Sequence, residues 1–426
     1  MKIIKYSELN NKRKAQLLER PLLESSKIYA IVQPMLNEIK KNGLPGVLKY
    51  AKKFDGLGSK NFKVSKKEIA ESKKLVSKEF KASVKIAVEN IRKFHKYQLP
   101  QKYSVQTMKG IKCSREFRAI ENIGIYIPGG TAVLPSTLMM LAVPAIIAGC
   151  KRIVVCSPSA SKIRPELLYV ADYLGITEFY KIGGAQAIGL MAYGTKSINK
   201  VDKIFGPGNQ YVNAAKALVS IDPAGCAIDM ISGPSEVLVI ADSSANPEFV
   251  SSDLLSQAEH GNDSQATLCT TSVKLAKKVV EVIERQVEKL ERKKYIKNSL
   301  KYSNVIIFKN ISQAIKFSND YAPEHLILQV RNPKSYVKKI QNAGSVFLGG
   351  YSPESVGDYA AGTNHSLPTN GYAKSVGGVS VEQFMKGITF QELTKNGLKK
   401  ISDVVIELAT AEKLQAHANA VKIRLS

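Results

Sequence analysis

The 426-residue sequence has few cysteines and no long apolar run, and each shortage excludes a class of protein. Five cysteines are scattered along the chain without a CxxC pair, namely Cys113, Cys150, Cys156, Cys226 and Cys269. An odd, scattered set favours reduced thiols over a disulfide framework. No apolar stretch approaches the roughly 20 residues of a membrane span, and the N-terminus MKIIKYSELNNKRK lacks a signal-peptide apolar segment. We therefore expect a cytoplasmic protein without a membrane partner.

Arginine is also scarce, although the chain is strongly basic. Lysine and arginine number 62 against 36 acidic residues, a formal charge of +26, but only 11 of them are arginine. Recognition of bases and phosphates favours the planar fork of arginine. Residues 121–270 hold nine basic and 13 acidic residues, so the excess lies in the flanks, on lysines that fit solvated helix faces. We therefore expect no nucleic-acid partner.

The order of apolar patterns predicts the fold class. Residues 1–100 have a helical pattern, ending in an amphipathic stretch from about Lys66 to Tyr97. From residue 119 onward, strand-like and helix-like segments alternate, with strands expected in IGIYI, RIVVCSP, EFYKIGG, VDKIFGPGN, EVLVIAD, ATLCTTS, NVIIF, HLILQV and GSVFLGG. This rhythm is typical of parallel strands joined by right-handed crossovers. We predict an α/β fold of two Rossmann-like lobes with parallel-rich sheets, plus helical N- and C-terminal extensions.

Four glycine clusters follow predicted strands: YIPGGTAVLPS (126–136), IGGAQAIG (182–189), FGPGNQYVN (205–213) and SGPSEV (232–237). Glycine lets the backbone approach a ligand, and a following helix N-terminus favours a phosphate. None matches GxGxxG, and any one alone fits an ordinary turn. Four together favour a nucleotide or anion crevice at the carboxyl ends of the strands. The side-chain amides of Gln186 and Asn209 are able to hydrogen-bond a ribose or a carboxamide there.

The chain has only five histidines, and two of them directly follow a glutamate. One pair is Glu324 and His325 in YAPEHLIL, an acid and a base at the entrance to a predicted strand. The other is in QAEHG, where Gln257 and His260 are three residues apart and share a helix face. That spacing suits a metal, while a histidine meeting the dipole of a helix C-terminus is an equally good interpretation.

The other polar candidates lie nearer the C-terminus. Asp358 and His365 fall in SVGDYAAGTNHSLPT, a segment of small residues that packs a core poorly, so its charged groups are expected to line a site. Glu412 and His417 lie five apart on a final helix, roughly 140° around it, and need not serve the same atom. We interpret His95 as a surface residue. No HExxH or cysteine-rich zinc pattern is present, so spacing alone stops at an α/β enzyme with metal use undecided.

A resemblance to a family extends this interpretation. The segment IDMISGPSEVLVIADSSANPEFVSSDLLSQAEHG (228–261) resembles the signature of histidinol dehydrogenases. YIPGG, GGAQAI, FGPGN, YAPEHL, GDYAAGTNH and EKLQAHANAV continue the likeness in order over essentially the whole chain. The resemblance implies oxidation of L-histidinol through L-histidinaldehyde to L-histidine with two NAD⁺, a zinc ion in each subunit and a homodimer. An alternative is another zinc- and NAD-dependent amino-alcohol dehydrogenase.

The resemblance also implies domains and residue roles. It implies an N-terminal extension (1–24), a zinc and substrate lobe (25–118 and 236–376), an NAD-binding lobe (119–235) and a C-terminal extension (377–426) that reaches the partner's site. It assigns acid–base work to Glu324 and His325, zinc to Gln257, His260, Asp358 and His417, and NAD⁺ contacts to Tyr126, Gln186 and Asn209. It assigns substrate contacts to Ser235, His365 and Glu412, together with His325 and the four zinc ligands.

Two other reaction types compete with this hypothesis. Aldehyde oxidation often proceeds through a cysteine thioester, but no cysteine accompanies either Glu-His pair. A zinc hydrolase without a nucleotide would use the same histidines and carboxylates. In the dehydrogenase, His325 serves as the base for the hydroxyl proton and Glu324 activates water for the aldehyde stage.

Overall fold

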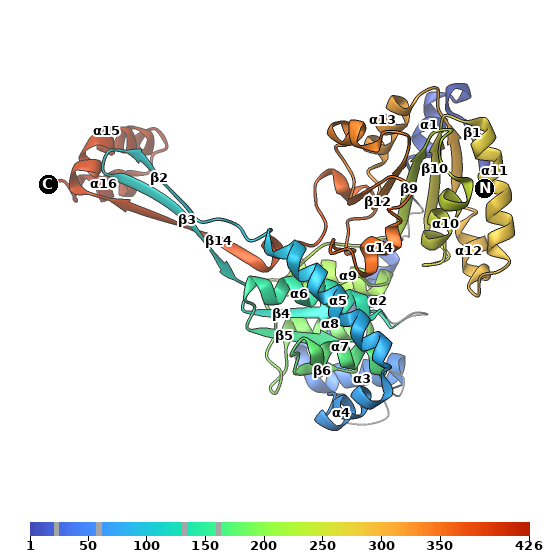
Figure 1. The fold of residues 1–426 in the computed structure, drawn as a ribbon. Coiled ribbons are helices and arrows are strands. Elements are labelled where there is room, and N and C mark those ends of the chain that lie inside the picture. The colour runs from blue at the N-terminus through green and yellow to red at the C-terminus, as the bar shows by residue number, and fades with distance from the viewer. Residues whose placement is uncertain (21–24, 57–61, 130–133, 159–162) are drawn as a thin grey trace.

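The computed structural model describes residues 1–20, 25–56, 62–129, 134–158 and 163–426. Two α/β lobes lie side by side, and a long arm projects from them (Figure 1). Part of the glycine cluster at 126–136 lies outside the described residues. Across the described ranges, no helix has the length and apolar content needed to cross a bilayer. Short 3-10 helices occur at Tyr6–Glu8, Pro333–Lys339, Tyr372–Lys374 and Val381–Phe384.

The first lobe is built on a parallel sheet in the order β6-β5-β4-β7-β8. Its strands are β4 (Asn122–Tyr126), β5 (Arg152–Cys156), β6 (Glu178–Tyr180), β7 (Lys203–Phe205) and β8 (Ala227–Ile228). The crossover helices are α6 (Pro135–Ala148), α7 (Pro165–Tyr173), α8 (Gly184–Tyr193) and α9 (Gln210–Ile221). The middle strand β4 buries Ile123 and Ile125 completely, which explains the near-continuous apolar runs in the sequence.

Four N-terminal helices pack on this first lobe: α2 (Ser25–Asn42), α3 (Leu44–Asp55), α4 (Lys66–Leu75) and α5 (Lys78–Lys96). Leu36 of α2 shares one core with Ile188, and Ile91 of α5 shares another with Leu138. The sequence analysis placed residues 25–118 with the zinc lobe instead. The difference arises because an amphipathic helix shows which of its faces is buried but not which sheet covers that face.

His95, on α5, is fully buried and not a surface residue as the sequence suggested. Its Nδ1 lies 2.9 Å from the Ile91 carbonyl oxygen and its Nε2 3.3 Å from the amide of Asn364. Burial lowers the pKa of this imidazole, so the neutral ring is favoured. The histidine was misjudged because lysines surround it in the sequence, whereas it lies on the apolar face of the helix.

The second lobe is a parallel sheet in the order β1-β11-β10-β9-β12-β13. Its strands are β1 (Lys2–Lys5), β9 (Glu236–Ala241), β10 (Gln265–Thr270), β11 (Asn304–Ile307), β12 (His325–Gln329) and β13 (Ser345–Leu348). Its helices are α1 (Asn11–Gln16), α10 (Pro247–Ala258), α11 (Val273–Val287), α12 (Lys293–Ser299), α13 (Ile311–Tyr321) and α14 (Glu354–Tyr359). β1 corrects the expectation of a purely helical N-terminus, because it pairs with β11 as an edge strand too short for a periodic signal.

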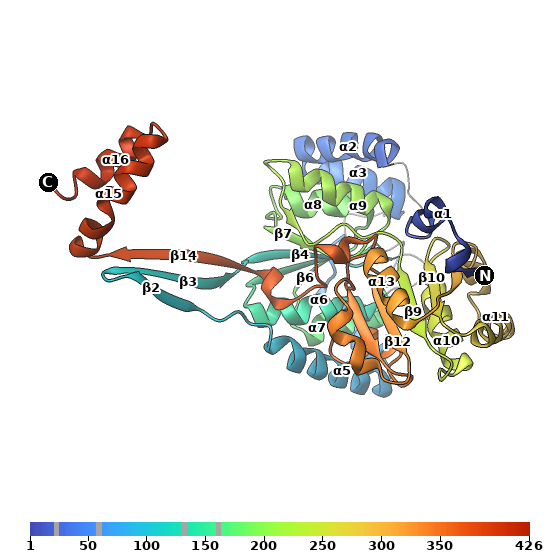
Figure 2. The same cartoon turned by 90° about the horizontal axis from the view of Figure 1, so that it is seen from above.

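The arm is an antiparallel sheet, β14-β3-β2, that ends in two helices (Figure 2). It comprises β2 (Tyr103–Met108), β3 (Ile111–Ala119), β14 (Met385–Leu393), α15 (Lys395–Ala411) and α16 (Gln415–Lys422). β3 and β14 pair along their whole lengths although about 270 residues separate them in sequence. The C-terminal extension is therefore not purely helical, and residues 103–119 belong to the arm. β2 is exposed throughout, so no buried face imposed a pattern that could reveal it.

Candidate active site

A pocket of about 820 Å³ lies between the two lobes. The first lobe contributes loop residues from Pro207 to Asn213 and from Asp229 to Ser235. The second lobe contributes the end of α10 with the residues after it, the residues at the start of β12, and the loop from His365 to Asn370. Most of the polar candidates from the sequence line it, namely Asn209, Ser235, Gln257, His260, Glu324, His325, Asp358 and His365.

The two sheets present opposite ends to this pocket. The 205–213 loop follows β7, so the first lobe uses the carboxyl ends of its strands as expected. The second lobe uses the amino ends instead, because Glu324 and His325 stand at the start of β12. A crossover helix runs antiparallel to its strands, which returns the C-terminus of α10, with Gln257 and His260, to the same edge. Glu324 and His325, at the entrance to β12, are thereby placed at the same edge as Gln257 and His260.

Glu324 and His325 are both buried and both contact the backbone of Glu236, the first residue of β9. The Glu236 N–H donates to Glu324 Oε2 at 2.9 Å, and His325 Nδ1 lies 3.2 Å from the Glu236 carbonyl oxygen. A carbonyl oxygen only accepts, so Nδ1 donates, and Nε2 remains as the nitrogen that exchanges a proton. Nε2 has no hydrogen-bond partner among the described residues and lies 3.6 Å from Asp358 Oδ1.

Crowded carboxylates determine the electrostatics of this pair. Burial raises the pKa of Glu324 to about 8 and that of Glu354 to about 8. Burial alone would lower the pKa of His325, but the carboxylates of Glu354, Glu324 and Asp358 outweigh it and raise the pKa to about 10. Burial likewise opposes ionisation of Asp358, yet the neighbouring His325 holds the pKa of that carboxyl below its usual value. A pocket with more carboxylates than cations attracts a further positive charge.

His260, Glu354 and Asp358 present ligand atoms that all lie within 4.8 Å of one another. His260 is exposed toward the pocket, and desolvation lowers the pKa of its imidazole, which favours the neutral, metal-binding form. In the amide orientation that satisfies both ends, the Gln257 nitrogen donates to Glu354 Oε1 at 2.5 Å and its oxygen accepts from the Glu236 N–H at 2.9 Å. Nitrogen and oxygen donors of this kind suit zinc.

Glu354 was missed in the sequence analysis, although a signal was present. Glu354 and Asp358 are four residues apart on α14, so both carboxylates lie on one face of the helix. The sequence drew attention to Asp358 through its small-residue surroundings, whereas Glu354 stands in the polar stretch YSPESV. Its complete burial is a tertiary property and could not be read from that stretch.

Ser235 and His365 complete the pocket wall near the pair. The Ser235 carbonyl accepts the N–H of Gln265 at 3.0 Å, and Ser235 lines the pocket. His365 Nδ1 lies 2.9 Å from the Asp358 carbonyl, and Nε2 lies 3.2 Å from the Thr137 hydroxyl. Both ring nitrogens are thus engaged by the protein, and burial lowers the pKa of the ring. In this geometry His365 holds the end of α14, which carries Asp358, in place.

Glu412 and His417 lie on the arm and not in the pocket of their own chain. Glu412 caps the end of α15 and His417 belongs to α16, and both are exposed. These helices stand at the far end of the arm, on the opposite side of the molecule from α10 and β12 (Figure 1). Within one chain, the structure therefore brings His260 and Asp358 together with Glu354, and it places Gln257 in contact with Glu354. His417 lies apart from this group.

The three residues expected to contact NAD⁺ are divided between two places. Asn209 lines the pocket and also caps α9, since its Oδ1 accepts from the N–H groups of Tyr211 and Val212. Tyr126 and Gln186 are buried together at the carboxyl end of β4, where the Tyr126 hydroxyl accepts the Gly184 N–H at 3.1 Å. Gln186 donates to Asp55 at 2.9 Å.

The cysteines do not support a thioester route. All five are free, and none is among the pocket-lining residues. Burial raises the pKa of Cys150 and of Cys226 to about 12, and it also raises the pKa of the fully buried Cys156 and Cys269. Thiolates, the reactive form, are therefore disfavoured at these four positions.

Comparisons with known proteins identify the family of the chain. The histidinol dehydrogenase family profile matches residues 18–425. The histidinol dehydrogenase of Bacteroides thetaiotaomicron is 49% identical over 428 residues, covering 100% of this chain and 99% of that protein. The Aliivibrio fischeri enzyme is 48% identical, with 100% and 97% covered. A crystal structure of histidinol dehydrogenase from Elizabethkingia anophelis superposes with a TM-score of 0.95 at 48% identity, covering 100% of this chain and 98% of that one. The chain belongs to the histidinol dehydrogenase family, the enzymes of the final step of histidine biosynthesis.

Proposed function

We propose that the pocket between the lobes binds L-histidinol and that Glu324 and His325 carry its four-electron oxidation, through L-histidinaldehyde, to L-histidine with two NAD⁺. The observation that carries the proposal is the buried Nε2 of His325. It lacks a hydrogen-bond partner in the described part of the chain, and it faces a group of metal-ligand atoms across 3.6 Å. An unpaired buried nitrogen costs free energy unless a substrate or proton satisfies it during function.

The donor set fits one zinc ion per subunit. Gln257, His260 and Asp358 would hold it from this chain, with His417 of a second copy as the fourth ligand and Glu354 bonded to Gln257 behind them. Bound zinc would polarise the substrate oxygen, and it would offset the carboxylate charge that raises the His325 pKa, which would favour the neutral imidazole that accepts a proton. Zinc also suits the imidazole and amine nitrogens of histidinol.

The two members of the pair divide the proton chemistry. In the first oxidation the His325 Nε2 takes the hydroxyl proton of histidinol, while its Nδ1–H stays on the Glu236 carbonyl. In the second oxidation Glu324 removes a proton from water that adds to the aldehyde carbon. A carboxyl with a pKa of about 8 exchanges protons near neutral pH, which suits this role. Ser235 borders the same pocket for substrate contact. NAD⁺ would bind along the carboxyl edge of the first sheet, where Asn209 lines the pocket and Tyr126 and Gln186 lie behind it.

The arm supports a homodimer with shared sites. It exposes apolar side chains that one chain leaves uncovered, among them Tyr103, Val105, Ile388, Phe390 and Leu408. A second set of exposed apolar side chains, called the rim below, lies on the 346–359 segment that carries the pocket residue Asp358: Val346, Tyr351, Val356 and Tyr359. Large exposed apolar patches mark interaction surfaces. We propose that the arm of one chain covers this rim on another and delivers Glu412 and His417 there. A cytoplasmic location remains a prediction from the sequence.

An assay of the purified protein tests the proposal as a whole. With histidinol, zinc and NAD⁺ present, two NADH should form for each histidine produced. Other amino alcohols should react much more slowly. Faster turnover of a different amino alcohol would transfer the proposal to that substrate, and histidine formation without NADH would reject the dehydrogenase assignment.

Glu324→Gln is expected to slow aldehyde oxidation more than alcohol oxidation, because only the second stage needs activated water. Single-turnover measurements started from histidinol and from histidinaldehyde separate the two stages. The matched control is Glu259→Gln, which changes the glutamate of the other Glu-His pair. Glu259 itself does not line the pocket, so both rates should stay close to wild type. Equal slowing of both stages by Glu324→Gln would contradict the water-activating role.

His260→Asn is expected to lose zinc while the protein stays folded, because an amide fits at the exposed end of α10. Loss of an outer-sphere partner alone typically reduces metal affinity roughly 10- to 100-fold, and loss of a ligand should cost at least as much. Zinc analysis after dialysis against a weak chelator measures the loss, with His95→Asn, a histidine outside the pocket lining, as the control that keeps its zinc. Stoichiometric zinc in His260→Asn would remove His260 from the ligand set.

A further inference from the structure

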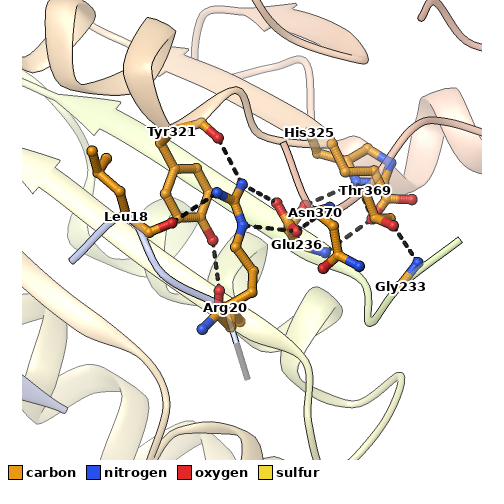
Figure 3. Close-up of polar contacts among 10 residues, drawn as sticks. Leu18, Arg20, Gly233, Glu236, Tyr321, His325, Thr369 and Asn370 are labelled. Atoms are coloured by element: carbon orange, nitrogen blue, oxygen red, sulfur yellow. Dashed lines mark hydrogen bonds and ion pairs between the residues drawn. The ribbon is translucent and has the colours of Figure 1, made fainter. Parts of the chain in front are cut away.

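Arg20 has a buried guanidinium that binds Glu236, the residue whose backbone contacts the proposed catalytic pair (Figure 3). It lies in the segment after α1, its side chain is only 10% exposed, and its partner Glu236 is 216 residues away in sequence. Nε donates to Glu236 Oε1 at 3.1 Å and Nη2 to Glu236 Oε2 at 2.8 Å. This parallel pair of bonds fixes the Glu236 carboxylate in both position and orientation.

The same guanidinium also holds the turn that leads into β12. Nη2 donates to the Tyr321 carbonyl at 2.7 Å, Nη1 donates to the Leu18 carbonyl at 3.0 Å, and the guanidinium carbon lies 3.6 Å from the centre of the Tyr321 ring. Tyr321 ends α13, three residues before Glu324, and its hydroxyl donates to Gln265 at 2.7 Å. Arg20 therefore joins the start of β9 to the turn that carries Glu324 and His325.

Glu236 transmits this anchoring to the pair through its backbone. Its N–H is the donor to Glu324 and its carbonyl oxygen is the acceptor for His325. Figure 3 shows Glu236 between Arg20 and His325. Its side chain is held on a second flank, where the Asn370 N–H donates to Oε1 at 2.7 Å. A side chain bonded at both carboxylate oxygens has one permitted rotamer, so the orientation of its own backbone groups is restricted as well.

Stability alone does not account for this ion pair. A buried pair loses much of its hydration, and replacement by apolar residues of similar volume is often neutral or stabilising. Only arginine offers a planar fork for the carboxylate, further donors for two carbonyls, and a face that stacks on a ring. Here these groups of Arg20 bind Glu236 and the Tyr321 carbonyl, next to the two side chains, Glu324 and His325, whose position matters for proton transfer.

We infer that Arg20 is a positioning residue for Glu324 and His325, acting through the carboxylate and backbone of Glu236 and through the Tyr321 carbonyl. This inference rests on the roles proposed above for the pair. It predicts that changes at Arg20 lower kcat and leave substrate and zinc binding nearly intact, since Arg20 itself does not line the pocket.

The test compares Arg20→Lys, Arg20→Met and the double variant Arg20→Met/Glu236→Gln in the full-length, zinc-loaded protein. Arg20→Met leaves the Glu236 carboxylate buried without its partner, so it is expected to lower the melting temperature. The double variant removes both charges, and its glutamine retains an acceptor for the Asn370 N–H, so it is expected to fold. We expect kcat in the double variant to fall by about 10- to 100-fold, the cost of misplacing reacting groups by a fraction of an ångström to an ångström. The histidinol KM should stay within about twofold.

Arg20→Lys keeps the charge but loses the fork, and its kcat should lie between wild type and the double variant. Arg285→Met serves as the matched control, because Arg285 pairs with Glu248 on the exposed face of the second lobe, away from the pocket lining. It should leave kcat unchanged. A wild-type kcat in the folded double variant would overturn the inference. If the double variant does not fold, Arg20→Lys decides instead, and an unchanged kcat there overturns the inference.

A double-mutant cycle separates positioning from general destabilisation. When His325 is already replaced by asparagine, Arg20→Met should reduce the residual rate of the first oxidation by less than about threefold, because the positioned group that acts in that step is gone. An equal loss in both backgrounds would indicate a structural role only and would overturn the inference. If His325→Asn and Glu324→Gln both retain full kcat, the proposed function fails first, whereas a loss in those variants without one at Arg20 rejects this inference alone.

Discussion

Replacing His325 by asparagine is expected to reduce kcat for histidinol by roughly 10²- to 10⁴-fold, the usual contribution of a general base. The imidazole Nε2 faces the pocket beside Asp358. Among the described groups next to Asp358, it alone is both buried and without a hydrogen-bond partner. Asparagine retains an amide that can still donate to the Glu236 carbonyl, so the local structure should persist. Steady-state kinetics with zinc analysis should show a lowered kcat, a nearly unchanged KM and full zinc content.

His95→Asn is the comparison for this variant. His95 is as deeply buried as His325, but it bonds to Ile91 and Asn364 and does not line the pocket. It should lower the melting temperature with little effect on kcat. If His325→Asn instead raised KM and left kcat unchanged, His325 would be a substrate-binding group and not the base.

The parallel lobes were predictable because their strands are buried on both faces. Runs such as EVLVIAD and HLILQV are apolar at almost every position, and the structure buries every residue of β9 and β12. The edge strand β1 and the arm strands lacked this signal. β2 is exposed throughout, and β14 meets β3 only across a large sequence separation, so neither local periodicity nor burial indicated them.

The candidate site was predictable where its chemistry is local. The Glu324–His325 dipeptide and the Gln257 and His260 spacing are visible in the sequence because neighbouring residues carry them. Arg20 and Glu236 were not, since each is an ordinary charged residue until the fold joins them across the second lobe. In the second lobe the pocket lies at the amino ends of the strands. This differs from the expectation, because ligands of parallel sheets usually bind at the carboxyl ends, whereas α10 ends at the amino edge and brings Gln257 and His260 there.

The arm leads to the second large effect, which concerns mixed dimers. His260 borders the pocket of its own chain. His417 belongs to α16, which stands at the end of the arm (Figure 2). If both serve one zinc ion, they belong to different chains. His260→Asn and His417→Asn are then each inactive as homodimers. In a heterodimer of the two, one site inherits both lesions and the other inherits neither.

Subunit exchange between these two inactive variants should therefore restore activity. Random exchange turns about half of the dimers into heterodimers, and one of the two sites in each heterodimer is intact. About a quarter of the wild-type activity should therefore return. Asp358→Asn provides the matched control, because Asp358 and His260 lie on the same lobe. Mixing Asp358→Asn with His260→Asn leaves one lesion in each site, so activity should stay near zero. Native mass spectrometry measures the heterodimer fraction in both mixtures. Heterodimers of His260→Asn and His417→Asn without recovered activity would mean that each chain completes its own site, and the shared site would be rejected.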